Sequence, residues 1–136
     1  MLWRVSYLRV LAALTMLFVS ASCGATPQVA GDWSGRVAPA HFDYLELRLT
    51  QKGKVIRGTA CYEVVPGSST GGVVFRDATV TGVYPTIKVT AANYNGWTFV
   101  GEFQDDGKLN GQWRSSTSSN YPMSLTRGLA GTPGCL

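Results

Sequence analysis

The chain has 136 residues, 16 of them glycine, and its twelve Lys and Arg against eight Asp and Glu give a formal net charge of +4. This length suits one domain with one hydrophobic core, and because no long stretch after the first 22 residues keeps a helical period, the composition predicts an all-β fold. Arg4 and Arg9 belong to the N-terminal segment discussed next, and the other basic residues form no cluster with aromatic residues, so we expect no nucleic-acid-binding surface.

The first 22 residues have the three parts of a secretory signal peptide. Arg4 and Arg9 give a positive start, residues 10–19 are mostly apolar, and residues 20–22 are small. An apolar run of about ten residues is half the length that a membrane-spanning helix needs. We therefore predict that residues 1–22 are a signal peptide that is removed from the mature protein.

The stretch Ser20-Ala21-Ser22-Cys23 resembles the lipobox of bacterial lipoproteins. The resemblance implies that Cys23 receives a diacylglycerol, that the leader is cut off before it, and that the protein is lipid-anchored in the bacterial cell envelope. Ser20 stands where that family usually has Leu, which leaves cleavage by the general signal peptidase as the alternative. Gly24 stands where an Asp would retain a lipoprotein in the inner membrane, so the resemblance favours the outer membrane.

The three cysteines give a second argument for acylation. In an exported protein, three cysteines cannot all pair in disulfides within the chain. Acylation of Cys23 would leave Cys61 and Cys135 as a disulfide pair in an oxidising compartment. Strand alternation places the sulfur of Cys61 on the outside of the fold. The eight steps from Arg127 to Cys135, at about 3.5 Å each, can reach that outer wall.

Residues 23–29 form a predicted tether, and the strands follow it. Five stretches repeat the pattern apolar-x-Gly-x-apolar, which predicts strands with glycine on the apolar face, where a missing side chain makes room for curvature or for a bulky neighbour. They are residues 33–37, 56–60, 80–84, 99–103 and 109–113.

Short turns connect these strands into hairpins. We predict two-residue turns at Lys52-Gly53 and Pro85-Thr86 and three-residue turns at residues 94–96 and 105–107. Large and small residues then face each other on one side of the sheet. The expected pairs are Leu49 with Ile56, Gly82 with Val89, Ala91 with Phe99, and Phe103 with Leu109.

A first strand through Trp33 and a last strand that ends at Arg127 complete the sheet. The result is an eight-stranded antiparallel up-and-down β-barrel over residues 30–127, wide enough for side chains or one small ligand, with a C-terminal tail over residues 128–136. Most of the tight turns fall at one end and the longer links at the other. The first strand begins at the tight end, so the tether leaves from that end and the looped end faces away from the membrane.

The motif Gly31-Asp32-Trp33 resembles the Gly-x-Trp of the lipocalin and wider calycin barrels. Arg127 on the last strand corresponds to the Arg that those families place over that Trp. The resemblance implies a calycin-like architecture, with Trp33 and Arg127 as a structural pair that closes the tight end of the barrel. A guanidinium on the face of an indole contributes about 0.5–2 kcal/mol.

Tyr62, Trp97, Phe99 and Trp113 share the apolar face near the looped end. They would line either an aromatic cup for a ligand or a plainly packed core. Arg76 is placed on the inner face near that end, where it would bind an anionic group. A bulge that turns Phe75 inward is the alternative.

No pattern in the sequence indicates catalysis, a metal or a cofactor. His41 is the only histidine, and Asp105 and Asp106 supply too few oxygen ligands for calcium and are typical of a turn. We therefore expect a binding module that captures a small apolar or aromatic ligand at the open end of the barrel. The alternative is a protein-interaction barrel, such as an inhibitor of an envelope hydrolase or an assembly factor.

Overall fold

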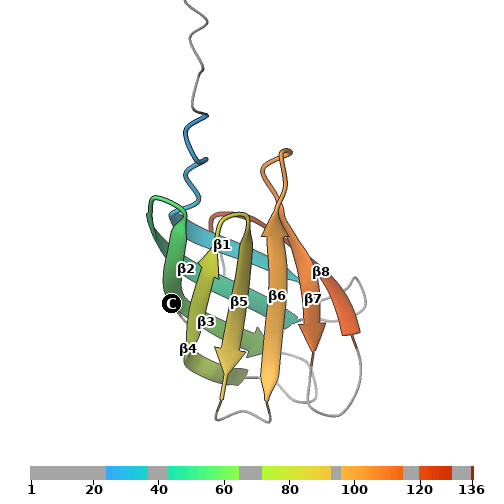
Figure 1. Cartoon of the computed structure of the whole chain (residues 1–136). Coiled ribbons are helices and arrows are strands. Elements are labelled where there is room, and N and C mark those ends of the chain that lie inside the picture. The colour runs from blue at the N-terminus through green and yellow to red at the C-terminus, as the bar shows by residue number, and fades with distance from the viewer. Residues whose placement is uncertain (1–23, 37–42, 65–71, 93–95, 115–119, 130–135) are drawn as a thin grey trace, which may run out of the picture.

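The computed structural model describes residues 24–36, 43–64, 72–92, 96–114, 120–129 and 136, and these residues form eight strands (Figure 1). The strands pair antiparallel in sequence order, and β8 also pairs with β1, so the sheet closes into a barrel. They are β1 (Gly31–Arg36), β2 (Asp43–Lys52), β3 (Val55–Val64), β4 (Gly72–Val83), β5 (Thr86–Ala91), β6 (Trp97–Phe103), β7 (Leu109–Arg114) and β8 (Asn120–Arg127). The predicted all-β barrel is confirmed.

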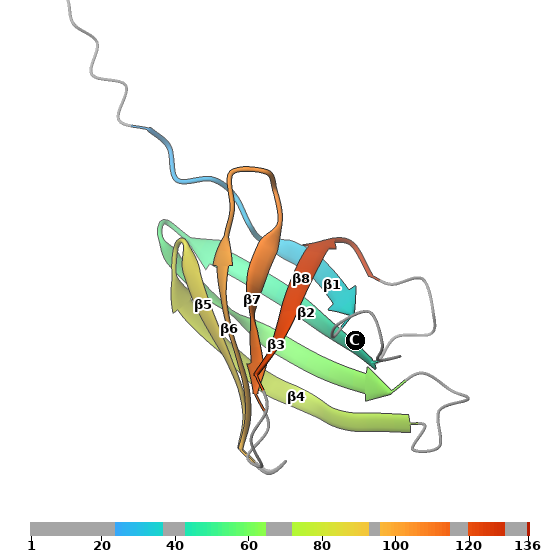
Figure 2. The same cartoon turned by 90° about the vertical axis from the view of Figure 1, so that its right-hand side faces the viewer.

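The signal peptide, Cys23, His41 and Cys135 lie outside the described residues, as do most of the predicted longer links. No helix in the described residues is long and apolar enough to cross a membrane. The described hairpin turns and residues 24–30 gather at one end of the barrel, as Figure 2 shows. We call this the closed end and the opposite end the looped end.

Alternation of buried and exposed residues builds the core. Along β5, Ile87, Val89 and Ala91 are buried and the residues before each of them are exposed, which is the period of two expected for a strand with one face inside. Gly101 also faces inward, and a Cβ placed there would lie 2.6 Å from the ring of Phe99. This glycine therefore makes the room for a bulky neighbour that the sequence pattern predicts.

The register between β2 and β3 differs from the prediction by two residues. Leu49 pairs with Gly58 instead of Ile56, because the turn is Gly53-Lys54 and not Lys52-Gly53. Gly53 has a φ of +59°, the left-handed conformation that a type II′ turn requires at its first central position. A shift by two residues keeps the same side chains inside, so the predicted inner face is correct although the predicted pairs are not.

Two other hairpins show the same shift. The turn after β4 is Tyr84-Pro85, with a cis peptide bond between the two residues, so Gly82 pairs with Ile87 and not with Val89. The loop after β5 spans residues 92–96, so Ala91 pairs with Trp97 and not with Phe99.

The hairpin between β6 and β7 has the predicted register, with Phe103 opposite Leu109. Its turn closes with a hydrogen bond from Gly107 N to Gln104 O, and Gly107 has a φ of +81°. Lys108 N donates to Asp106 Oδ1 at 3.0 Å, so this aspartate acts as a turn former, as the sequence indicates.

Candidate functional site

Residues 27–30 cover the closed end of the barrel. Val29 N donates to Gln51 Oε1 at 2.7 Å, and Gln51 Nε2 donates to Pro27 O at 3.0 Å. The side chain of Val29 is buried and belongs to the hydrophobic core. The second half of the predicted tether is therefore part of the fold. The sequence did not indicate this, because a single buried apolar residue, Val29, produces no recognisable pattern.

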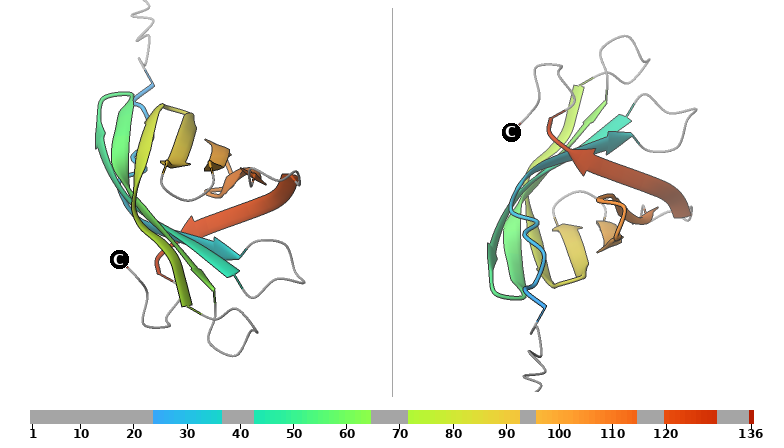
Figure 3. Two further views of the ribbon diagram at one scale, coloured as in Figure 1. Left: turned by 90° about the horizontal axis from the view of Figure 1, so that it is seen from below. Right: turned by 90° about the horizontal axis from the view of Figure 1, so that it is seen from above.

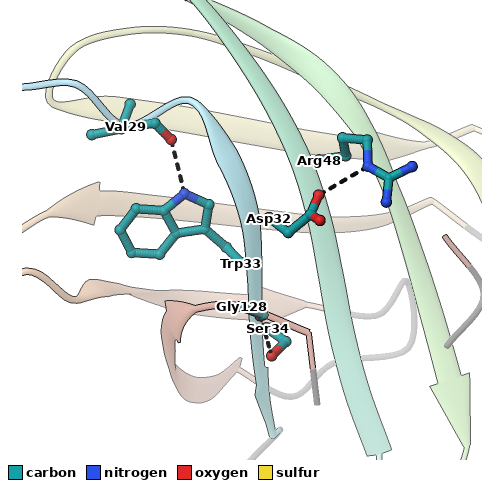
Figure 4. A network of polar contacts seen from close by, with 6 residues as sticks. All are labelled: Val29, Asp32, Trp33, Ser34, Arg48 and Gly128. Carbon is teal, nitrogen blue, oxygen red and sulfur yellow. Dashed lines mark hydrogen bonds and ion pairs between the residues drawn. The ribbon is translucent and has the colours of Figure 1, made fainter. Parts of the chain in front are cut away.

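Trp33 lies under this segment at the centre of the closed end. Its indole Nε1 donates to Val29 O at 2.8 Å (Figure 4), and its ring packs edge-on against Phe103, with 5.1 Å between centroids. The guanidinium carbon of Arg127 lies 4.9 Å from the centroid of the Trp33 ring. The contact expected from the Gly-x-Trp motif and the last-strand arginine is therefore present.

Arg127 also ties the N-terminal segment to β8. Its Nη1 donates to Ala30 O at 2.9 Å, and its Nη2 donates to Gln28 O. One guanidinium thus donates to two backbone carbonyls while it stacks on the indole. Arg can do both because its donors lie in one plane, whereas Lys cannot. This arrangement leaves little of Trp33 for a ligand, because only 2% of the residue is exposed.

The opposite face of β1 carries polar contacts that join strands distant in the sequence. Arg48 Nε donates to Asp32 Oδ1 at 2.9 Å, and Ser34 Oγ donates to Gly128 O at 2.7 Å (Figure 4). Gly128 N in turn donates to Asp32 O at 2.8 Å. These bonds hold the start of the C-terminal tail against the outside of β1.

Aromatic side chains fill the looped end. We call Tyr62, Phe75, Trp97 and Trp113 the aromatic cluster. Tyr62 stacks on Trp113 with 4.7 Å between ring centroids, and Trp97 meets Trp113 edge-on at 5.1 Å. Phe75, Tyr62 and Trp113 are at most 3% exposed, whereas Trp97 is half-buried. Phe99 is fully buried below the cluster. The structure thus brings the predicted aromatic residues together, and it packs them against each other.

Arg76 does not lie on the inner face, and that prediction is wrong. Ala60 pairs with Ala78 but Tyr62 pairs with Phe75, so β4 carries a bulge between these pairs, at which Asp77 has a φ of +56°. The bulge turns Phe75 inward and leaves Arg76 exposed. The alternative drawn from the uneven alternation of β4 is correct, and Phe75 replaces Arg76 at the looped end.

A second unexpected feature lies on the outer wall of β2 and β3. Glu46 and Cys61 are cross-strand neighbours at positions that alternate away from the core, yet both are fully buried. Glu63 lies further along the same wall and is 9% exposed. We call Glu46 and Glu63 the buried acidic pair. Strand alternation alone assigns such outward positions to solvent, so alternation does not predict this burial.

The environment of Glu63 disfavours its charge. Burial raises the pKa of this carboxyl above its ordinary value of 4.5, the negative charge of Glu46 raises it further, and Arg76 opposes both by lowering it. In the described part of the chain, Glu63 Oε2 is buried without a hydrogen-bond partner. The folded protein therefore holds a proton on Glu63 more tightly than the unfolded chain does.

The described surface has several hollows. One of about 150 Å³ is lined by Arg76 with neighbouring residues of β4 and β5, and none of the four predicted aromatic residues lines it. A hollow of about 640 Å³ lies on the outer wall and is lined by Arg36 and by residues of β7 and β8. A hollow of about 220 Å³ lies at the closed end beside Trp33 and Arg127. No group of three His, Cys, Asp or Glu in the described ranges is arranged to hold a metal ion.

Comparison of the chain with protein-family models, with curated proteins and with solved structures found no match. Its architecture is that of a closed eight-stranded antiparallel barrel, consistent with a calycin-like barrel.

We predict that Trp33 and Arg127 stabilise the barrel as a unit. Trp33→Ala should lower the free energy of unfolding by about 3–5 kcal/mol. The loss from the double variant with Arg127→Ala should be smaller than the sum of the two single losses by about 0.5–2 kcal/mol, because the stacking contact can be removed only once. Urea unfolding of the four proteins measures this. Arg127→Lys is the matched control, which keeps the charge and loses the planar stack. Additive losses would contradict the prediction.

We also predict a pH-dependent cost of the buried acidic pair. Because the folded pKa of Glu63 is raised, the stabilisation from its protonated form is present below the ordinary pKa of 4.5 and is lost as the pH rises through the folded pKa. Glu63→Gln removes the titration, so its stability advantage over the wild type should grow as the pH rises. The measurement is urea unfolding from pH 4 to 8, with the exposed Glu102→Gln as control. An advantage that stays constant with pH would show that the pKa is not raised.

Proposed function

We propose that the chain is a lipid-anchored protein of the bacterial envelope whose barrel acts as a rigid protein-interaction module. The observation that supports this function is the aromatic cluster, in which stacked and edge-on rings occupy the looped end of the barrel. A pocket for a small ligand would need that space. A barrel packed at both ends presents its outer surface and its connecting loops to a partner, and an envelope hydrolase or an assembly complex is the kind of partner that we propose.

The anchor that we propose is an acylated Cys23 at the outer membrane. The N-terminal signal pattern and the small residues before Cys23 support it. Among the described residues, the first one hydrogen-bonded to the barrel is Pro27, so residues 24–26 would separate the acylated residue from that bond. Several acyl chains on one residue give much stronger membrane binding than the marginal binding of a single chain.

We propose in addition that Cys61 and Cys135 form a disulfide. Cys61 occupies an outward position on β3 and is nevertheless fully buried, as a strapped outer wall would require. The bond from Ser34 Oγ to Gly128 O and the bond from Gly128 N to Asp32 O hold the start of the tail against the outside of β1. Cys135 itself lies outside the described residues.

Intact mass spectrometry of the mature protein, purified without reductant from a bacterial host, tests both proposals. We expect a chain that begins at Cys23 and carries acyl groups, and thiol alkylation that modifies neither Cys61 nor Cys135 unless the protein is reduced first. Cys23→Ala should lose the acyl mass and any palmitate label. An acyl label that survives in Cys23→Ala would refute the proposed anchor. Alkylation of both Cys61 and Cys135 without reduction would refute the proposed disulfide.

A small-ligand site is the second candidate, favoured by the half-buried ring of Trp97 at the rim of the aromatic cluster. Opening the looped end for a ligand would separate this ring from Tyr62 and Trp113. The cost would be their edge-on contacts, each of about 0.5–1.5 kcal/mol.

Titration with the neutral apolar dye N-phenylnaphthylamine distinguishes the two functions. We expect no saturable fluorescence increase with the wild type, because the cluster leaves no room. Trp113→Ala removes a large buried ring and should create a cavity that binds the dye, which makes it the positive control. Saturable binding by the wild type that Trp97→Ala abolishes would overturn the interaction module in favour of the ligand site.

A further inference from the structure

Basic and apolar side chains gather on the outer face of β2 to β5 at the closed end. Lys52 pairs with Val55, and Val55 pairs with Val83, in one row across the sheet. Val55 is 46% and Val83 is 59% exposed, the two largest values among the exposed large hydrophobic residues of the described surface. The next row inward places Arg57 opposite Thr81 and Thr81 opposite Lys88. We call the set of Lys52, Lys54, Val55, Arg57, Val83 and Lys88 the basic edge.

The charges of the basic edge are not neutralised by neighbours. The ion pairs of Arg48 with Asp32 and of Lys108 with Asp106 involve no cation of the edge, and no cation of the edge has another ion pair within the described ranges. Along the row of Val55 and Val83 the first carboxylate is Glu102 on β6, opposite Thr86. A shallow hollow of about 330 Å³, lined in part by Lys52, Val55 and Arg57, lies within the edge. Four unpaired cations around exposed valines are suited to a surface that is both anionic and apolar.

The N-terminal segment leaves the barrel beside this edge. Gln51 Nε2 donates both to Pro27 O and to Gly53 O, so the segment is fixed to the turn that carries Lys54. Figure 3 shows residues 24–30 passing along the β2 and β3 side of the closed end, away from the β6–β7 turn. The four steps from Pro27 back to Cys23 span at most about 14 Å. A membrane anchor on Cys23 would therefore hold the basic edge within reach of lipid headgroups.

We infer that the basic edge docks on an anionic membrane surface and fixes the orientation of the anchored barrel. The inference rests on the proposed acylation for the position of the edge, and on the described side chains for its chemistry. Phosphate headgroups would meet the four cations, and Val55 and Val83 would enter the interfacial layer between them. The turn with Asp105 and Asp106 also lies at the closed end, so the barrel must tilt toward β2 to β5, the side from which the anchor leaves.

Hydrogen exchange of the purified mature protein on vesicles tests this docking. On vesicles that contain phosphatidylglycerol, the amides of Gly53, Lys54 and Tyr84 should exchange about fivefold more slowly than on phosphatidylcholine, the factor expected for the attraction of about one cation. The amides of residues 105–107 are the internal control and should not change. High salt should reverse the difference, because exposed charges are screened.

Charge reversal separates the basic edge from the anchor. The double variant Lys52→Glu with Lys54→Glu should lose the protection on phosphatidylglycerol and still sediment with both kinds of vesicle. Lys108→Glu, at the other turn, should behave as the wild type. A wild-type protein that sediments with both vesicles but exchanges equally on them would overturn the docking and leave the anchor intact. Sedimentation with phosphatidylglycerol alone, released by salt, would support the basic edge and refute the anchor.

Discussion

The structure depends on the closure of β8 on β1. Within the described residues, the ladder between these strands has two pairs, Trp33 with Arg127 and Ser34 with Thr126, fewer than at the other strand pairings of the barrel. Arg127 reinforces this short seam, because its guanidinium stacks on Trp33 and binds the carbonyls of two residues that cross the end of the barrel. Without the seam the sheet would have two open edges and an exposed interior, the condition that a closed barrel avoids.

Packing at both ends is the basis on which we propose a function at the outside of the molecule. Residues 27–30 and Trp33 seal the closed end, and the aromatic cluster fills the looped end. The outer wall, in contrast, departs from a plain polar surface in two places. The basic edge leaves valines and cations exposed, and the buried acidic pair keeps carboxylates away from solvent. We therefore propose that partners and membranes bind to the wall.

The fold could be predicted because most strands alternate, and alternation decides which side chains point inward. The site could be predicted where a motif marks it, as for Trp33 and Arg127. For Arg76 the sequence left two alternatives open, and the bulge at the left-handed Asp77 selects the one with Phe75 inside. The burial of Glu63 could not be predicted, because alternation tells which way a side chain points and not what covers it.

The two-residue register shifts have a consequence for the size of the barrel. The diameter of a closed sheet depends on its strand number and on its shear, the total offset accumulated around the ring. Alternation does not change when two strands slip by two residues, but the shear does. The turns at Gly53 and Pro85 therefore help to set the width of the interior, although both lie at the closed end and the aromatic cluster lies at the other. Moving either two-residue turn by one position along the chain would keep every side chain on its face and still alter the space that the four rings share.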